Sequence, residues 1–158
     1  MSSETAAVVV RAGEGRAVRW GPAGTIRFLA GADSTGGDFS LVEAVEEPGS
    51  AAPLHVHHGE AEAFYVVEGQ IELTCGGQSL TASAGDFVYT PKDVPHKYAV
   101  VGDRPARVLL LFSRPGFERF FAEGGAPLDE PPAGPPDPEA MRRLIEKYDL
   151  ELLESFGH

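Results

Sequence analysis

The chain has 158 residues, with 24 acidic and 13 basic side chains and a formal net charge of −11. Binding to nucleic acid or to an anionic membrane needs clustered Lys and Arg, so this composition argues against both partners. The length fits one domain with a proper hydrophobic core. The 19 Gly and 13 Pro residues indicate many turns, and therefore many short strands.

Cys75 is the single cysteine of the chain, so we expect no disulfide within it. Residues 1–10 lack the basic region and the long apolar region of a secretory signal. No apolar run approaches the length of a membrane span. We therefore expect a soluble cytoplasmic protein.

Residues 1–24 are interpreted as an N-terminal segment and residues 25–113 as one β domain. Short apolar or alternating runs separated by Gly, Pro and Asp predict an antiparallel sandwich or barrel in this domain. The seven predicted strands are 25–30, 38–45, 63–67, 70–75, 86–90, 96–101 and 106–112.

Residues 114–158 form a third region, in which 116–123 is predicted to be a short helix. Six prolines between 124 and 138 exclude the interior of a sheet and indicate a surface arm. Asp137 followed by Pro138 is typical of a helix start. The next apolar side chains recur at helical spacing and predict a face that packs against the barrel or a partner subunit: Met141, Leu144, Ile145 and Tyr148.

The histidines form the most informative pattern in the sequence. His55 and His57 are two residues apart, so on an extended segment both side chains lie on one face, and His58 points the opposite way, toward solvent or a rim. Glu62 and His96 open later strand-like runs. Three imidazoles and one carboxylate suit Fe, Mn, Ni, Co, Cu or Zn, and ligand type does not choose among these metals.

The same residues lie in a motif that resembles the cupin superfamily. Gly49, His55, His57, Glu62 and Gly69 have every residue type and spacing of the first cupin motif.

A second cupin motif is matched less completely by Gly85, Pro91 and His96. Asp93 stands where a glycine is expected, and Val100 where an asparagine is expected. Asp93 is tolerable because Asp is one of the few residues that adopt left-handed turn geometry. Two further stretches look like single-domain cupins of the quercetin dioxygenase-like group: 62–69 and 115–121.

The resemblance implies a cupin jelly-roll β-barrel with a short C-terminal helical extension. It also implies that one divalent transition metal is bound inside the barrel mouth by His55, His57, Glu62 and His96. Small cupins commonly dimerise, so we expect a homodimer. The apolar segment Ala6–Val10 has no partner among the predicted strands and is a candidate for the contact.

Strand parity predicts the walls of the cavity. Phe64 shares the face of Glu62, and Tyr98 shares the face of His96, so each is either a contact for a small, apolar or aromatic ligand or a core side chain. Arg27 could bind an anion in the mouth, or lie on the outer face beside a carboxylate. Glu60 and Glu68 are expected to be hairpin charges.

Three functions follow as hypotheses. The first is a dioxygenase for a small enol- or phenol-type, flavonol-like substrate, in which Glu62 accepts the substrate proton and has its pKa raised toward the working range. The second is a non-catalytic cupin that binds or senses a metal and a small molecule. The third is a sugar or sugar-phosphate isomerase, which ranks last because few basic side chains can approach the mouth.

The acidic side chains are unevenly distributed along the chain. Residues 29–90 contain ten acidic residues and no Lys or Arg, and they supply three of the four predicted ligands. This stretch should favour a divalent cation and disfavour a strongly anionic substrate.

Overall fold

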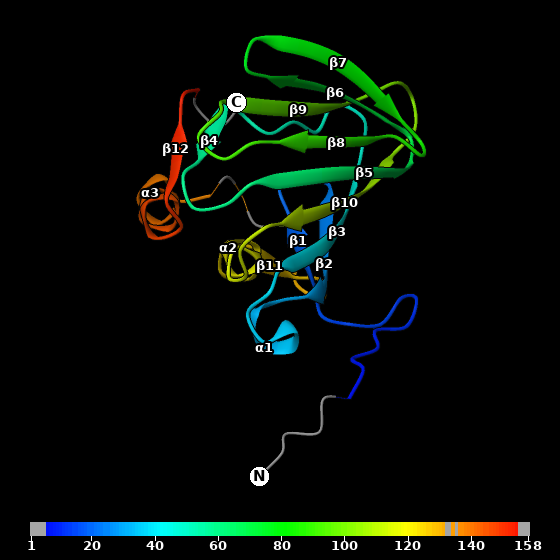
Figure 1. The fold of residues 1–158 in the computed structure, drawn as a ribbon, viewed down its shortest axis with the longest axis vertical. Helices are drawn as coiled ribbons and strands as arrows, with labels where there is room; N and C mark the ends of the chain where they lie inside the picture. Colours follow the sequence, from blue (N-terminus) through cyan, green and yellow to red (C-terminus); the bar gives the residue numbers. More distant parts are fainter. Residues whose placement is uncertain (1–5, 132–133, 135, 155–158) are drawn as a thin grey trace.

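The computed structural model describes residues 6–131, 134 and 136–154. They form two antiparallel sheets with α2 and α3 gathered at one end (Figure 1). The predicted all-β barrel with a short C-terminal helix is confirmed. The first five residues of the predicted N-terminal segment and the last four of the predicted arm lie outside this description.

The larger sheet has seven strands in the order β11-β1-β2-β3-β10-β5-β8. Burial alternates along β3, where Ser40, Val42, Ala44 and Glu46 face inward, because successive side chains of a strand point to opposite faces. The strands are β1 (Ala17–Trp20), β2 (Gly24–Ala30), β3 (Ser40–Glu46), β5 (Glu62–Glu68), β8 (Phe87–Thr90), β10 (Ala106–Phe112) and β11 (Ala126–Pro127).

The smaller sheet has five strands in the order β12-β4-β9-β6-β7. Its short strand β4 lies between β9 and β12, and it is joined to β9 at His55 opposite His96. The strands are β4 (His55–His57), β6 (Gln70–Cys75), β7 (Gln78–Ser83), β9 (His96–Val101) and β12 (Leu150–Leu152).

The core fills the space between the inner faces of the two sheets. Phe64 of β5, Ile71 and Leu73 of β6 and Phe112 of β10 have no measurable exposure to solvent. Full burial of such a side chain contributes about 1.5–3 kcal/mol. Packing between the inner faces of the two sheets therefore stabilises the barrel.

Two turns require special backbone geometry. Gly69 has φ of 81°, and a Cβ atom there would lie 2.6 Å from the carbonyl oxygen of Pro105, so only glycine fits this close approach. Asp93 has φ of 66°, which confirms that an Asp occupies the left-handed position in place of the expected glycine.

The helices cover one end of the barrel. The short α1 (Ala32–Thr35) precedes β3, while Phe120 and Phe121 of α2 (Glu118–Gly124) pack against Trp20 with ring centroids 5.2 and 5.0 Å apart. Asp137 caps α3 (Pro138–Lys147) by accepting hydrogen bonds from two amides of its first turn. The predicted packing of its apolar face on the barrel is confirmed for Met141, Leu144, Ile145 and Tyr148. Among the described residues, no helix is both long and apolar enough to cross a membrane.

All seven predicted strands are present, with ends that differ by at most two residues. The sequence did not predict β1, β4, β7, β11 or β12. Four of these strands have only two to four residues, and β7 is polar except at Leu80 and Ala82, so none carries a strong apolar period. The strand β11 lies at the edge of the larger sheet. Pro127 is tolerated there because an edge strand does not require a backbone N–H from every residue.

Candidate metal centre

Three histidines and one glutamate meet inside the barrel, near the end covered by α2. His55 and His57 come from β4, Glu62 from the start of β5 and His96 from the start of β9. One ligand atom from each lies within 4.8 Å of the others. The four residues predicted from the sequence are therefore brought together, and they could hold a metal ion.

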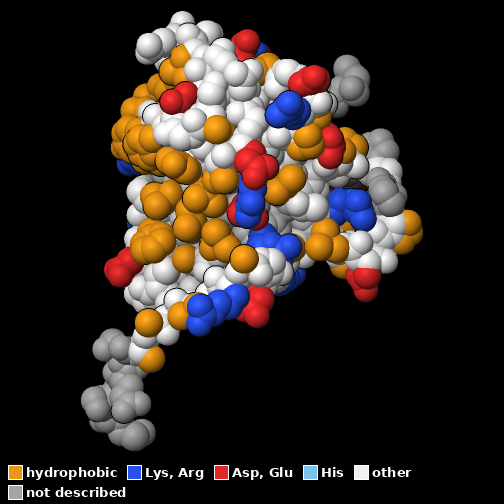
Figure 2. All heavy atoms as spheres, turned by 90° about the vertical axis from the view of Figure 1, so that its right-hand side faces the viewer, with side chains coloured by type: hydrophobic (Ala, Val, Ile, Leu, Met, Phe, Trp, Pro, Cys, Tyr) orange, Lys and Arg blue, Asp and Glu red, His pale blue; other side chains and the backbone are white. Residues whose placement is uncertain are grey.

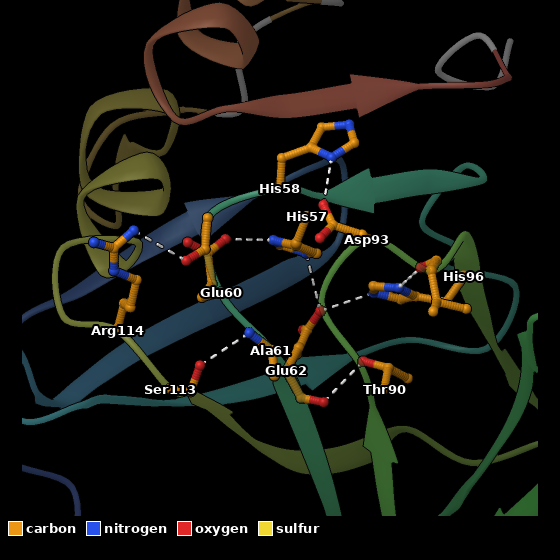
Figure 3. Close-up of polar contacts among 12 residues, drawn as sticks. His57, His58, Glu60, Ala61, Glu62, Thr90, Asp93, His96, Ser113 and Arg114 are labelled. Carbon is orange, nitrogen blue, oxygen red and sulfur yellow. Dashed lines mark hydrogen bonds and ion pairs between the residues drawn. The ribbon is translucent and has the colours of Figure 1, made fainter.

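Glu62 occupies the centre of this group. Its Oε2 atom lies 3.1 Å from Nε2 of His57 and 3.0 Å from Nε2 of His96 (Figure 3). These three side chains are almost fully buried, whereas His55 is half-buried. The Nε2 atoms and the carboxylate oxygen thus point toward one small volume.

The other ring nitrogens are bound to oxygen atoms outside the cluster. Nδ1 of His55 lies 2.6 Å from the carbonyl oxygen of Pro53, and Nδ1 of His96 lies 3.2 Å from the carbonyl oxygen of Val94. Nδ1 of His57 lies 2.7 Å from Oε1 of Glu60. A carbonyl or carboxylate oxygen accepts the Nδ1 proton, so Nε2 is the ring nitrogen that can bind a metal. The donor set and its supporting contacts therefore fit a divalent transition metal.

The surroundings of the cluster shift the pKa values of its two β4 histidines in opposite directions. Burial alone lowers the pKa of His57, but hydrogen bonds with Glu60 and Glu62 outweigh it and raise this pKa to about 9. Burial, together with the neighbouring His96, lowers the pKa of His55 to about 4.

The pKa of Glu62 is the reverse of the sequence prediction. Burial acts to raise it, but hydrogen bonds with His57 and His96 hold it well below the ordinary value for Glu. The expected upward shift is therefore wrong, because two imidazoles stabilise the ionised carboxylate. At neutral pH, Glu62 is therefore an anion, whereas His57 must lose a proton before it can bind a metal ion.

A cavity adjoins the cluster and is lined mainly by apolar side chains. His55, His57 and Glu62 form part of its wall. The other lining residues come from β1, the loop before β4, β9, β10, α2 with the residue before it, and β12: Trp20, Ala52, Pro53, Tyr98, Leu110, Phe117, Phe120, Phe121, Leu150 and Leu152.

The three predicted ligand-contact residues lie in different places. Tyr98 lines the cavity, and its hydroxyl donates a 2.8 Å hydrogen bond to Glu46. Phe64 is fully buried in the core and is not part of the lining. Arg27 donates hydrogen bonds to the carbonyl oxygens of residues 13–15 and is also not part of the lining, so we leave it out of the proposed site.

Glu60 is the main site residue that sequence reasoning missed. The sequence predicts only a hairpin charge, but Glu60 is 7% exposed and bonded to His57. His58, as expected, points away from the cluster, and it is bonded to Asp93 and Glu151 at distances of 2.8 and 2.7 Å. The aromatic wall from 117–121 had one signal in the sequence, the resemblance of residues 115–121 to small cupins.

The comparisons with known proteins agree with this geometry. Residues 42–112 match the family described as Cupin domain, and this match and the fold identify the chain as a cupin. Within that superfamily it resembles the quercetin dioxygenase-like group. Quercetin 2,3-dioxygenase of Bacillus subtilis (strain 168) is 31% identical over 134 residues, which are 81% of this chain and 39% of that protein.

Solved structures share the fold. KdgF from Halomonas sp. superposes with a TM-score of 0.62 at 18% identity, over 72% of this chain and 99% of that one. A predicted oxalate decarboxylase from Thermotoga maritima gives the same TM-score at 22% identity, over 68% of this chain and 99% of that one. The chain spans 39 to 56% of the length of the first curated relatives that it matches.

Proposed function

We propose that this protein is a metal-dependent dioxygenase that acts on a small enol- or phenol-type substrate of the flavonol class. One observation carries the proposal: a cluster of three histidines and one glutamate opens onto an apolar, aromatic-lined cavity. The 31% identity to quercetin 2,3-dioxygenase over 81% of the chain supports the choice of reaction.

Each part of the site has a task in this proposal. A divalent metal held by His55, His57, Glu62 and His96 would supply a Lewis acid for the substrate oxygen and a template that places dioxygen beside it. Glu62 is ionised at neutral pH and can accept the proton of the substrate hydroxyl, and its lowered pKa makes it a weaker base than the sequence predicted.

The cavity wall limits what can bind. The rings of Phe117, Phe120 and Tyr98 line the cavity, and they suit contact with a flat aromatic ligand. Among the described residues, no Lys or Arg lines the cavity. A phosphate group would find no Lys or Arg partner there, which disfavours a sugar-phosphate isomerase.

The test is oxygen uptake. Protein loaded with Fe, Mn, Ni or Co is mixed with a flavonol in air, and oxygen consumption and loss of flavonol absorbance are followed together. We expect uptake with at least one metal, and none with His57→Ala, which should also contain less metal on elemental analysis. No uptake with any metal refutes the proposal. A ligand retained tightly without turnover, detected by mass spectrometry of the denatured protein, would instead indicate a binding or sensing cupin.

A further inference from the structure

Glu46 is a buried acid that no positive charge balances. It is the last residue of β3, is 7% exposed and faces the interior of the barrel. Among the residues that the structure describes, its hydrogen-bond partner is the hydroxyl of Tyr98, and no Lys, Arg or His pairs with it. Burial raises the pKa of Glu46, because a carboxylate away from water is costly. Such an acid is a candidate for a functional role.

Acidic side chains at the surface show the more usual arrangement. Figure 2 shows Lys and Arg side chains lying among Asp and Glu side chains on one face of the molecule. On the outer face of β3 itself, Glu43 lies 2.9 Å from Arg107. Glu46 therefore differs from its neighbour on the same strand in having a neutral phenol, and not a cation, as its partner.

The strand register places Glu46 beside the cavity. Glu46 pairs with Gly24 of β2, and Gly24 pairs with Trp20 of β1, which lines the cavity. On its other side Glu46 pairs with Ala106 of β10. Because Gly24 and Ala106 are small, the carboxyl group is open to a side chain from the opposite sheet, and Tyr98 of β9 reaches it. The hydrogen bond thus joins the two sheets across the barrel interior.

This hydrogen bond determines what Tyr98 can offer to a ligand. A tyrosine hydroxyl has one proton, and here that proton is donated to Oε1 of Glu46 over 2.8 Å. Phe64 packs against the ring edge-on, with the ring centroids 5.6 Å apart. We infer that Tyr98 accepts a hydrogen bond from a hydroxyl group of the ligand in the cavity, and that Glu46 is a positioning residue that orients the Tyr98 hydroxyl for this contact.

The inference deepens the proposed function and rests on it for the use of the cavity as the ligand site. Tyr98 lies two residues along β9 from His96, so one ligand can meet the metal at one end and Tyr98 at the other. The favoured class is then an aromatic compound with a second hydroxyl group away from the metal. A carboxylate or an ether is disfavoured at that position, because neither can donate a hydrogen bond to Tyr98.

Isothermal titration calorimetry of the Zn-loaded full chain under nitrogen tests the inference without any oxidation. The probes are 2-naphthol, which has one hydroxyl group, and naphthalene-2,6-diol, which has a second at its other end. We expect the preference for the diol to be about 3- to 10-fold smaller in Tyr98→Phe than in the wild type, which is the effect of one neutral hydrogen bond. Tyr148→Phe is the matched control, because Tyr148 also donates to a carboxylate, at 2.6 Å from Glu123, but does not line the cavity. It should keep the wild-type preference.

Two variants of Glu46 test its positioning role. A third probe, 6-methoxy-2-naphthol, can only accept a hydrogen bond at the end where the diol can donate one. In the wild type it should bind less tightly than the diol. In Glu46→Ala the Tyr98 hydroxyl is free to turn and donate, so this difference should fall. Glu46→Gln keeps an oxygen acceptor and should restore the difference, a rescue that a merely structural role would not produce.

Several outcomes overturn the inference. They are a wild type that binds none of the three probes, a preference for the diol that is equal in Tyr98→Phe and the wild type, and a preference that Tyr148→Phe abolishes. Circular dichroism and Zn content check that each variant is folded. If Tyr98→Phe fails to fold, the comparison of Glu46→Ala with Glu46→Gln replaces it, and equal preferences in these two variants overturn the inference. Oxygen uptake is measured separately, so the inference and the proposed oxidation can fail independently.

Discussion

The contact between Glu60 and His57 gives the sharpest test of how the metal cluster is held. Both side chains are nearly fully buried, and their 2.7 Å contact joins a carboxylate to a ring nitrogen. In Glu60→Ala, Nδ1 of His57 loses its acceptor, and no constraint keeps the proton on that nitrogen. Loss of such a contact lowers metal affinity by about 10- to 100-fold, or about 1.4–2.8 kcal/mol. We expect Glu60→Ala to weaken metal binding by this factor.

The assay is a competition titration between the protein and a chelator of known affinity, with Zn as the probe. Glu118→Ala is a matched control, because Glu118 is 8% exposed and accepts hydrogen bonds from the amides of Ala32 and Gly116. It should lower the free energy of unfolding by about 1–3 kcal/mol and leave metal affinity unchanged. Glu60→Gln, which keeps an oxygen acceptor, should recover most of the affinity. Equal affinities in wild type and Glu60→Ala would refute this account of the cluster.

Two further predictions concern groups around the site. In Tyr98→Phe, Glu46 loses its hydrogen-bond donor while burial still raises its pKa, so the free energy of unfolding should fall by about 1–3 kcal/mol. An acid whose pKa is raised in the folded state destabilises the fold as pH rises above the pKa that the acid has in the unfolded chain. Urea denaturation should therefore show that Tyr98→Phe loses more free energy of unfolding at pH 7 than at pH 4. An equal loss at both pH values would contradict the reasoning. The second concerns His58, whose contacts with Asp93 and Glu151 raise its pKa. Protonated His58 stabilises the position of β12 through the contact with Glu151. This stabilisation is present below the unfolded-state pKa of about 6.5 and is lost as pH rises through the folded-state pKa of His58. Hydrogen-exchange protection factors of β12 should therefore fall over that range in the wild type and stay flat in His58→Gln.

The cluster itself could be predicted from the sequence, in part from local geometry and in part from the family resemblance. The spacing of His55 and His57 places both side chains on one face of β4, and the resemblance to the cupin motifs supplies Glu62 and His96. The parity argument also holds for Phe64, which is buried on the inner face of β5. Periodicity and motif spacing were sufficient for these residues.

The surroundings of the cluster could not be predicted in the same way. Leu150 and Leu152 reach the cavity because β12 pairs with β4, a contact between segments about 95 residues apart that no local pattern encodes. The burial of Glu60 and the lowered pKa of Glu62 likewise depend on which side chains the tertiary fold places beside them. Sequence spacing identifies ligands better than it identifies their neighbours.

The pairing of β12 with β4 has a consequence for how the site is assembled during synthesis. β12 follows His55, His57, Glu62 and His96 in chain order, so it emerges from the ribosome after all four. Until it emerges, β4 has a free edge and the cavity lacks the wall that Leu150 and Leu152 provide. The four ligands thus precede in the chain the strand that completes the cavity wall around them.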